Sequence, residues 1–346
     1  MKLKFSVYDL KLKHTFRISR SSRDIQEVVI TELEHDGIVG YGEAAPSRRY
    51  GETVDTVQQF LKKLDLSRFD DPFKLENILS SVDNAAPGNT SAKAAIDIAL
   101  HDWIGKAVNL PLYRYWGLDK EKTPVTSFTI GIDSPEMIAK KIDEAEEYPI
   151  LKIKLGGGND EEIIRTIRSV TKKTLRVDAN EGWKTKEMAL ERIQWLEQEG
   201  VEFVEQPMPV QDLTGTAWLR ERVKIPLIAD ESSLRLHDIP NLQNVFDGVN
   251  IKLMKCTGLR EGMKMIHAAR ACGLKIMVGC MIETSIAISA AAQFSPLIDY
   301  ADLDGAVLTT NDPFDGMRIE QGRLILPDRP GIGVKRREGL PDYTKS

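Results

Sequence analysis

Three acidic residues each stand at the end of a short apolar run, and their spacing is nearly regular. They are Asp178, Glu205 and Asp230, which lie 27 and 25 residues apart by subtraction of their positions. A single carboxylate at the end of a strand is usually a helix cap or a surface residue. Three on consecutive parallel strands would meet, and carboxylates that meet repel one another unless a cation joins them. An all-oxygen set suits Mg²⁺ first and Mn²⁺ next, so the sequence predicts a divalent metal site.

Two lysines could move protons beside these acids. Lys152 and Lys154 are two residues apart in a run that is otherwise apolar, so both side chains point to one side of a strand. Such pairs are common on exposed strands, but a strand buried on its outer face leaves only the inside of a closed sheet for them. Two close ammonium groups lower each other's pKa, so that one can be a free amine near neutral pH.

A third lysine, Lys252, ends a later apolar run, and we expect it across the mouth from the first pair. Lys255 is the competing candidate, but it lies beyond the run and we expect it to serve the adjacent loop. Two amines on opposite sides of a metal-bound carboxylate can take a proton from one face of the α-carbon and return one to the other. The pattern therefore favours inversion of a carbon α to a carboxylate through an enediolate.

A pair of acids near the end of the chain needs a separate role. Asp302 and Asp304 are two residues apart and far around the ring from the metal acids. They could hold the ammonium group of a substrate. The alternative is that they cap the turn that follows.

Regular spacing also predicts the elements that position these groups. Eight residues recur at steps of 22 to 28, about the length of a strand, a helix and two loops. They are Thr129, Lys154, Asp178, Glu205, Asp230, Lys252, Cys280 and Asp304. Apolar runs at 125–130, 151–155, 175–179, 203–206, 227–229, 249–253, 276–280 and 300–304 predict strands. Helices between them, such as 161–170, 186–198 and 259–271, predict parallel pairing and closure into a (β/α)8 barrel of the α/β class.

Segments on either side of the repeat predict a second domain. Alternating residues at 3–12, and a hairpin of 27–33 with 38–41 around His35-Asp36-Gly37, are followed by helical patterns. We therefore expect an α+β capping domain at 1–115 and the barrel at 116–316. A last hairpin turns at Gln321-Gly322, and we expect residues 317–346 to return to the capping domain and complete it.

Bulk composition excludes several classes of partner. The chain has 346 residues, a net charge of −5, 42% hydrophobic and 29% charged residues, so we expect neither a nucleic-acid nor an anionic-membrane partner. Its three cysteines, Cys256, Cys272 and Cys280, predict no disulfide framework and favour a reducing cytoplasm. The N-terminal residues lack the apolar stretch of a signal peptide.

Taken together, these motifs resemble the enolase superfamily, in its muconate-lactonizing subgroup, and among its members the dipeptide epimerases. The resemblance covers nearly the whole chain. It rests on Tyr41-Gly-Glu-Ala44, Lys152-x-Lys154, the acids at 178, 205 and 230, Asn250-Ile-Lys-Leu-Met-Lys255 and Asp302-x-Asp304. Departures are small: Cys256-Thr257-Gly258 stands where Gly-Gly is commoner, and Cys280 where Ser or Gly is commoner.

This resemblance implies roles for single residues. It implies that Asp178, Glu205 and Asp230 bind Mg²⁺ and that Lys154 and Lys252 are the two acid/base catalysts. Lys152 would lie near the substrate carboxylate, and Asp302 with Asp304 would bind the α-ammonium. Thr129, Cys280 and Ile282 would line the dipeptide site. Arg20 or Arg23, in a specificity loop of the capping domain, would meet an acidic side chain of the substrate.

The resemblance also implies a biological setting. It implies a cytoplasmic isomerase, favours a homo-oligomer, and points to L-Ala-Glu-like dipeptides from cell-wall peptide turnover. The alternative within the fold is an o-succinylbenzoate synthase or a muconate-type cycloisomerase, which has no ammonium for Asp302 and Asp304 to bind. A non-catalytic barrel with a binding pocket is the rival of another class, and it leaves the retained acids and lysines unexplained.

Overall fold

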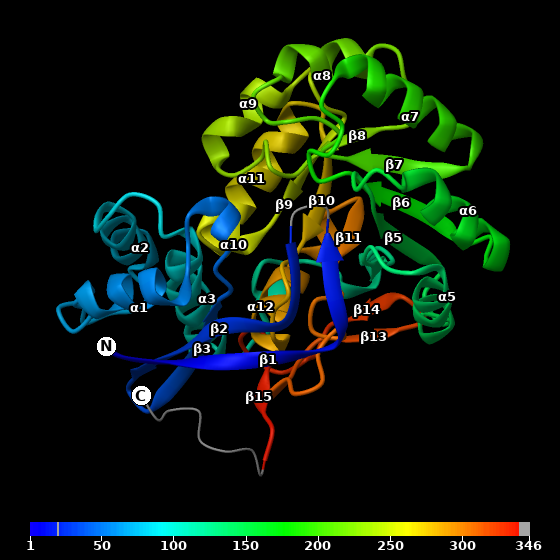
Figure 1. Cartoon of the computed structure of the whole chain (residues 1–346). Coiled ribbons are helices and arrows are strands. Elements are labelled where there is room, and N and C mark those ends of the chain that lie inside the picture. The colour runs from blue at the N-terminus through cyan, green and yellow to red at the C-terminus, as the bar shows by residue number, and fades with distance from the viewer. Residues whose placement is uncertain (19–20, 339–346) are drawn as a thin grey trace.

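The protein has two parts, a smaller part built on antiparallel strands and a larger ring of parallel strands surrounded by helices (Figure 1). The computed structural model describes residues 1–18 and 21–338. The predicted fold class is confirmed: an α/β barrel preceded in the chain by an α+β capping domain.

The cap is a three-stranded antiparallel sheet covered by helices, with the strands in the order β1-β2-β3. Its elements are β1 (Lys2–Ile18), β2 (Ser21–His35), β3 (Ile38–Ala44), α1 (Val54–Lys63), α2 (Leu75–Asn84) and α3 (Thr90–Ala107). The predicted hairpin joins β2 to β3. Asp36 and Gly37 form its turn with φ angles of 50° and 75°, the positive values that a tight two-residue hairpin turn requires.

Close contact between α3 and β3 depends on two glycines of β3. A Cβ atom on Gly40 would lie 2.1 Å from the carbonyl oxygen of Ala99, and one on Gly42 would lie 1.9 Å from that of Ala95. Both distances are far below van der Waals contact. The small residues on both elements therefore let helix and sheet backbones touch.

Eight parallel strands form the barrel, paired in chain order from β4 to β11. They are β4 (Phe128–Ile130), β5 (Ile150–Lys154), β6 (Thr174–Asp178), β7 (Val201–Glu205), β8 (Leu227–Ala229), β9 (Gly248–Ile251), β10 (Lys275–Gly279) and β11 (Tyr300–Asp302). The two end strands meet where Thr126 and Ala301 form a parallel bridge. Beside it the Ser127 N–H donates to the Ala301 carbonyl oxygen at 3.2 Å, which closes the ring.

Helices between the strands cover the outside of the ring (Figure 1). They are α5 (Pro135–Glu144), α6 (Asp160–Val170), α7 (Lys186–Gln198), α8 (Leu213–Arg220), α9 (Ile239–Leu242), α11 (Leu259–Ala271) and α12 (Ser285–Ala292). Predicted helices 186–198 and 259–271 have the bounds of α7 and α11, because their apolar residues recur at helical spacing. Shorter helical segments are η1 (Arg48–Tyr50), α4 (Leu112–Tyr115), η2 (Lys120–Lys122), η3 (Leu236–Asp238), α10 (Leu253–Cys256) and η4 (Ser295–Leu297).

Two predicted strands are too long at their C-terminal ends. The strand predicted at 249–253 stops at Ile251, and Lys252 precedes the short helix α10. The strand predicted at 300–304 stops at Asp302. In α10 the N–H groups of Lys255 and Cys256 both donate to the Lys252 carbonyl oxygen. These local bonds replace the strand pairing that an apolar run alone suggests.

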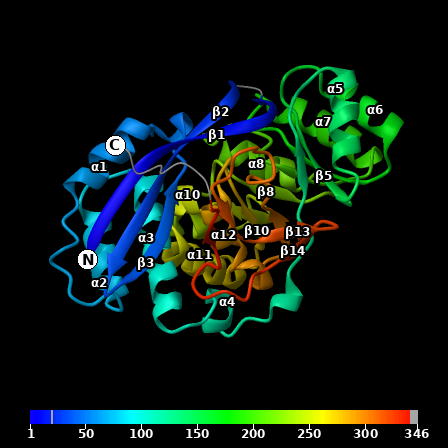
Figure 2. The same cartoon turned by 90° about the horizontal axis from the view of Figure 1, so that it is seen from below.

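The C-terminal segment adds β12 (Phe314–Asp315), β13 (Arg318–Glu320), β14 (Arg323–Ile325) and β15 (Lys335–Arg336). Its hairpin turns at Gln321-Gly322 and lies beside the barrel, where Arg323 forms a bridge with Val125 just before β4 (Figures 1 and 2). There the Thr126 N–H donates to the Gly322 carbonyl oxygen. Contact with the cap comes after the hairpin, where the Ile332 N–H donates to the Asp102 carboxylate at 2.9 Å.

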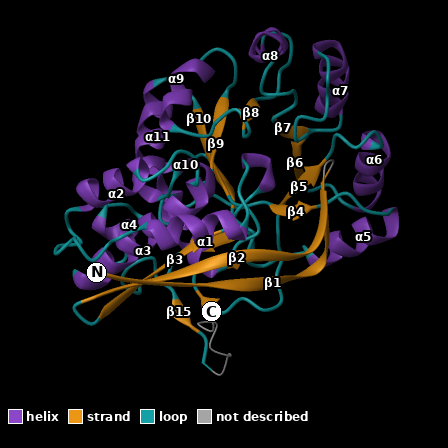
Figure 3. Cartoon of the chain, turned by 60° about the vertical axis from the view of Figure 1, so that its left-hand side comes forward, coloured by secondary structure: helices purple, strands orange, loops and turns teal. Residues whose placement is uncertain are grey.

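One part of the cap reaches the barrel mouth. Strands β1 and β2 run as a long ribbon from the cap toward the barrel strands (Figure 3). Phe16 and Ile18, near the end of β1, line the same pocket as Lys154 of the barrel. Residues of the cap therefore form part of the lining of the pocket at the barrel mouth. Over the described ranges, no helix has the length and apolar character needed to cross a membrane.

Candidate active site at the barrel mouth

Three acids meet at the carboxyl ends of neighbouring strands. Asp178 ends β6, Glu205 ends β7, and Asp230 follows β8. One carboxylate oxygen from each lies within 4.8 Å of the others, and all three side chains are buried. The register of the parallel strands brings them together, since Asp178 is paired directly with Glu205 across β6 and β7.

Lys152 lies at the centre of this acid cluster. Its Nζ is 2.7 Å from a Glu205 oxygen, 3.3 Å from an Asp178 oxygen and 2.7 Å from an Asp302 oxygen. Burial favours the neutral amine, but these carboxylates outweigh burial and raise the pKa of Lys152 above its usual value. For Lys152, the expected lowering of the pKa by a second amine is therefore wrong, because the three carboxylates around its amine have the larger effect.

The other two lysines of the prediction contact different ends of the cluster. The Lys154 Nζ lies 2.6 Å from an Asp178 oxygen, and the Lys252 Nζ lies 2.7 Å from an Asp230 oxygen. Lys154 comes from β5, while Lys252 follows β9, with the acid-bearing strands β6, β7 and β8 between them. The two amines thus approach the acids from opposite sides of that row of strands.

Two further residues fix the cluster, and sequence reasoning did not assign them this role. Lys255 is buried, and its Nζ bonds the Asp230 carboxylate, the Asp230 carbonyl oxygen at 2.6 Å and the Asn250 carbonyl oxygen at 3.1 Å. It therefore anchors an acid and does not serve the loop. The Asn250 amide donates to Glu205 Oε1 at 2.7 Å. Asn250 could have been found, since it stands two residues before Lys252 and so faces the same side.

The three acids differ in pKa because their neighbours differ. Burial raises the pKa of Glu205, and the adjacent Asp178 carboxylate raises it further, to about 7. Burial acts on Asp178 in the same direction, but the Lys154 and Lys152 ammonium groups outweigh it and lower that pKa to about 2. The Asp230 pKa is likewise well below its usual value, because Lys252 and Lys255 outweigh burial.

This donor set fits a hard divalent cation. It consists of carboxylate oxygens, which Mg²⁺ prefers, and no histidine or cysteine takes part among the described residues. Asn250 Oδ1 is buried and accepts no hydrogen bond, and the buried Glu205 Oε2 has the Lys152 ammonium nitrogen at 2.7 Å as its contact. A cation would complete the coordination of such an oxygen.

Asp302 and Asp304 lie inside the barrel on the far side of Lys152 from Asp178. Asp302 accepts hydrogen bonds from Lys152 Nζ and from Ser127 Oγ, both at 2.7 Å. Asp304 accepts the Thr129 N–H at 2.6 Å. Burial and the neighbouring Asp302 raise the pKa of Asp304 to about 7. The Asp302 carboxylate is therefore already in contact with an ammonium group, that of Lys152.

A pocket of about 770 Å³ opens above these groups, within the range of small-ligand sites. Both parts of the protein line it. The barrel contributes Thr129, Lys152, Lys154, Lys252, Cys280, Ile282, Asp302 and Asp304, and the cap contributes Phe16, Ile18, Arg23, Gln26, Arg48, Arg49 and Tyr50. Arg23 bonds Gln26 and Ser21 in its own strand. Arg20, the other predicted arginine, lies outside the described residues.

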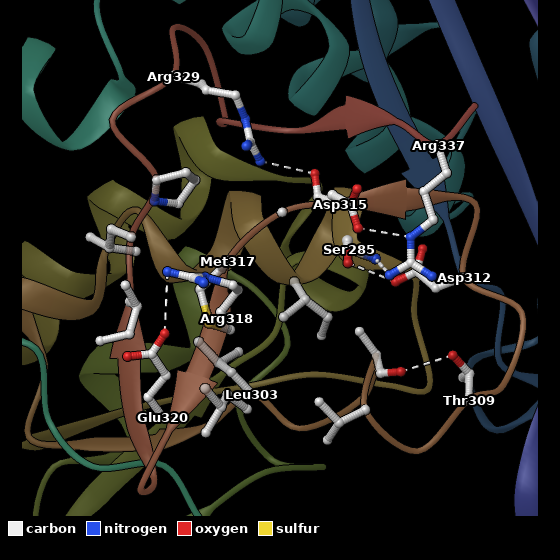
Figure 4. Close-up of a pocket in the computed structure, with 18 of the residues that line it drawn as sticks. Ser285, Leu303, Thr309, Asp312, Asp315, Met317, Arg318, Glu320, Arg329 and Arg337 are labelled. Carbon is white, nitrogen blue, oxygen red and sulfur yellow. Dashed lines mark hydrogen bonds and ion pairs between the residues drawn. The ribbon is translucent and has the colours of Figure 1, made fainter.

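A second hollow lies beside the C-terminal segment, away from the acids (Figure 4). Its volume is about 1280 Å³. The charged groups along it bond one another, as Arg337 does with Asp315 at 2.8 Å and Arg318 with Glu320 at 3.2 Å. It brings together no cluster able to bind a metal among the described residues.

Comparisons with known proteins agree with this geometry. A relative from Bacteroides thetaiotaomicron, named L-Ala-D/L-Glu epimerase, is 52% identical over 97% of this chain and 88% of its own length. One from Pedosphaera parvula, named L-Ala-D/L-amino acid epimerase, is 43% identical over 97% of this chain and 99% of its own. The crystal structure of a dipeptide epimerase from Cytophaga hutchinsonii, complexed with Mg and D-Ala-L-Val, superposes with a TM-score of 0.90 at 29% identity. That alignment covers 98% of this chain and 96% of the other.

Family models match both parts of the chain. The mandelate racemase/muconate lactonizing enzyme N-terminal domain matches residues 4–117, and the enolase C-terminal domain-like family matches residues 137–339. With the acids and lysines gathered at the mouth of the barrel, the chain belongs to the mandelate racemase/muconate lactonizing enzyme family of the enolase superfamily.

Proposed function

We propose that this protein is a Mg²⁺-dependent dipeptide epimerase that inverts the α-carbon of the C-terminal residue of L-Ala-Glu-like dipeptides. The single observation that carries the proposal is the placement of two buried amines. Lys154 Nζ contacts Asp178 and Lys252 Nζ contacts Asp230, at opposite ends of one acid cluster. The name of the Bacteroides thetaiotaomicron relative supports the substrate.

In this proposal Asp178, Glu205 and Asp230 hold the metal, which supplies Lewis-acid stabilisation to the substrate carboxylate when bound. Lys154 and Lys252 act on the α-carbon from its two faces. One removes the α-proton as a free amine, and the other returns a proton to the opposite face of the planar enediolate as an ammonium group. The pKa of Lys252 favours the ammonium form here, since Asp230 outweighs burial and raises it.

The remaining groups of the pocket hold the substrate in place. Lys152 lies beside the position of the substrate carboxylate and neutralises charge there. Asp302 and Asp304 bind the α-ammonium, with the Lys152 contact of Asp302 exchanged for the ligand. Thr129, Cys280 and Ile282 line the dipeptide, and a cap arginine, for which Arg23 is one predicted candidate, meets an acidic side chain. Arg20 is the other predicted partner for that side chain.

The same proposal includes a setting. It places the enzyme in the cytoplasm, in turnover of cell-wall peptides, as a homo-oligomer. The Asp302 and Asp304 pair favours an epimerase of free dipeptides over an o-succinylbenzoate synthase or a cycloisomerase, whose substrates carry no ammonium group. It also disfavours a non-catalytic barrel, for which a buried, raised-pKa acid such as Asp304 would only be a cost.

The test is incubation of the Mg²⁺-loaded protein in D₂O with a library of L-Ala-X and X-Glu dipeptides. We expect mass spectrometry to show one deuterium at the α-carbon of the C-terminal residue and chiral chromatography to show both epimers. A library returned without deuterium would overturn the proposal. The o-succinylbenzoate precursor, run beside it, would reveal the alternative activity.

A further inference from the structure

One arginine of the cap, Arg48, lines the pocket, and its guanidinium is not paired with an acid of the described chain. Arg48 is the first residue of η1, and its exposed side chain borders the pocket that also contains Lys154, Lys252 and Asp302. Across the described part of the chain, no carboxylate forms an ion pair with its guanidinium, and no acceptor bonds it.

Other cations of the same pocket are already engaged. The Arg49 guanidinium forms a bidentate contact with the Glu181 carboxylate, to which Nε and Nη2 donate at 2.9 to 3.1 Å. Arg23 bonds Gln26 and Ser21. The lysines at the bottom of the pocket bond the acids. Among the described arginines that line this mouth, Arg49 is paired with a carboxylate and Arg23 is held by Gln26 and Ser21, whereas the Arg48 guanidinium has no such contact and can turn toward a ligand.

The turn that carries Arg48 is held in place on both sides. The N–H groups of Tyr50 and Glu52 donate to the Ser47 carbonyl oxygen at 3.0 and 3.1 Å. Next to it, the Arg49 contact with Glu181 ties the turn to the loop after β6, which follows the metal acid Asp178. A guanidinium on a fixed backbone loses less freedom when it binds a carboxylate, so such a position suits recognition.

On an acidic dipeptide, the side-chain carboxylate is the one charged group for which the barrel residues provide no partner. Under the proposed function, Asp302 and Asp304 take the α-ammonium, and the metal acids with Lys152 take the α-carboxylate. The side-chain carboxylate of a C-terminal glutamate must extend toward the cap, where arginines border the pocket. A guanidinium can bind such a carboxylate through two parallel hydrogen bonds.

We infer that Arg48 binds the side-chain carboxylate of the C-terminal residue and determines the preference of this enzyme for acidic dipeptides. This inference rests on the proposed function. It assigns the role to the η1 turn and leaves Arg23, on the β1–β2 ribbon, as a residue held by its own strand. Because Arg48 lies far from the acids in the sequence and outside the barrel strands, only the folded cap brings it to the pocket.

The experiment compares two dipeptides of nearly equal shape, L-Ala-L-Glu and L-Ala-L-Gln, by α-deuterium incorporation in D₂O. In Arg48→Ala we expect kcat/KM for L-Ala-L-Glu to fall about 10- to 100-fold, the range for a lost charged hydrogen bond. We expect kcat/KM for L-Ala-L-Gln to change less than about 3-fold. Arg48→Glu should lower the ratio of the two further and raise turnover of L-Ala-L-Lys relative to the parent protein.

Arg114→Ala is the matched control, because Arg114 is an exposed arginine on α4, away from the pocket. It should leave both values unchanged. Arg23→Ala is measured in parallel, and a Glu-specific loss there with none in Arg48→Ala would overturn the inference. Equal losses on both dipeptides in Arg48→Ala would also overturn it, since they indicate a role in shaping the turn. If the parent protein exchanges the α-proton of no dipeptide, the proposed function itself fails, whereas exchange without a Glu preference removes only the role of Arg48.

Discussion

At the scale of single residues, the site is a set of buried charges that offset one another. Within the described chain, buried lysines surround buried acids. Lys154 bonds Asp178 at one end of the cluster, and Lys252 bonds Asp230 at the other. The members are Lys152, Lys154, Lys252 and Lys255 with Asp178, Glu205, Asp230 and Asp302. Removing one member leaves a partner buried and unpaired, which costs more than the pair contributes. Substitutions must therefore be assayed for folding as well as for turnover.

Loss of either proposed base should stop epimerisation but not all proton exchange. In Lys154→Ala and Lys252→Ala we expect conversion between epimers to fall at least about 10³-fold, within the range for loss of an acid or base catalyst. Each variant should still exchange the α-proton of one epimer, and the two variants should retain opposite epimers, because the remaining amine reaches one face. Chiral chromatography and deuterium incorporation separate the two readouts.

Lys122→Ala is the control for this pair, since Lys122 is exposed in η2. Calorimetric titration with Mg²⁺ should show binding in all three variants. Near-normal conversion in either base variant would refute the two-base mechanism.

At the scale of elements, the packing within the cap and the contact between cap and barrel each depend on very few atoms. The tight approach of α3 to β3 requires the missing side chain of Gly42. On the barrel side, the cap residue Glu43 is fully buried and accepts the N–H groups of Thr284 and Ala287 at the start of α12, at 2.9 and 3.2 Å. The Gly42 contact packs the cap helix on the cap sheet, and the Glu43 bonds join that sheet to the barrel helix α12.

Adding one methyl group at Gly42 should separate α3 from β3. In Gly42→Ala, the new Cβ would lie 1.9 Å from the Ala95 carbonyl oxygen. We expect the free energy of unfolding to drop by about 3 kcal/mol or more, as overpacking against backbone does. Gly88→Ala is the control, because nothing lies within 4 Å of its added Cβ and its φ of +62° costs only about 1 kcal/mol. Equal losses in urea unfolding would show that the close contact is not required.

Glu43 should make stability fall as pH rises. Burial raises its pKa, and the nearby Glu283 raises it further, to about 8. A carboxyl group whose folded pKa exceeds its unfolded value stabilises the fold fully below the unfolded value, and that contribution is lost as pH rises through the folded value. Each pKa unit of difference corresponds to about 1.4 kcal/mol. We therefore expect the free energy of unfolding to decrease between about pH 4.5 and 8.

Glu43→Gln keeps the shape and removes the titration. Urea unfolding at pH 5.5 and 8.5 should show a smaller loss in this variant than in the parent protein. The same pH dependence in both proteins would mean that Glu43 stays ionised throughout. Because Glu283 also has a raised pKa, of about 7, part of the dependence should persist.

At the scale of the whole molecule, both parts of the chain form the pocket, and we expect the fold not to need the metal. Cap and barrel each line the pocket, and the β1–β2 ribbon carries cap residues to the mouth (Figure 3). In the metal site itself, ammonium groups already compensate the acids. The protein can therefore fold before a cation arrives.

Chelation should abolish activity without unfolding the protein. After EDTA treatment we expect no α-deuterium incorporation and an unchanged far-UV circular dichroism spectrum. Readdition of Mg²⁺ at about 100 times its dissociation constant should restore turnover and stabilise the fold by about 2.7 kcal/mol. A thermal melt with and without Mg²⁺ measures this gain. Unfolding on chelation, or a melt indifferent to Mg²⁺, would contradict the expectation.

Local patterns were enough to predict the ring and the charged groups that meet at its mouth. Alternation places Lys152 beside Lys154, and apolar runs ending in Asp178, Glu205 and Asp230 place acids at strand ends. A parallel barrel brings all such ends to one mouth, so period and residue type determined which groups meet. Helix bounds such as those of α7 and α11 followed from the same local periodicity.

Only the tertiary structure determined which side chains bond one another at that mouth. Lys255 reaches Asp230 because α10 turns the chain back, a helix that an apolar run cannot reveal. Asp302 meets Lys152 across 150 residues because the ring closes between β4 and β11. Arg48 reaches the pocket because the cap docks over it. Each of these contacts depends on where distant backbones come to lie, and the spacing of residues along one chain carries no measure of that.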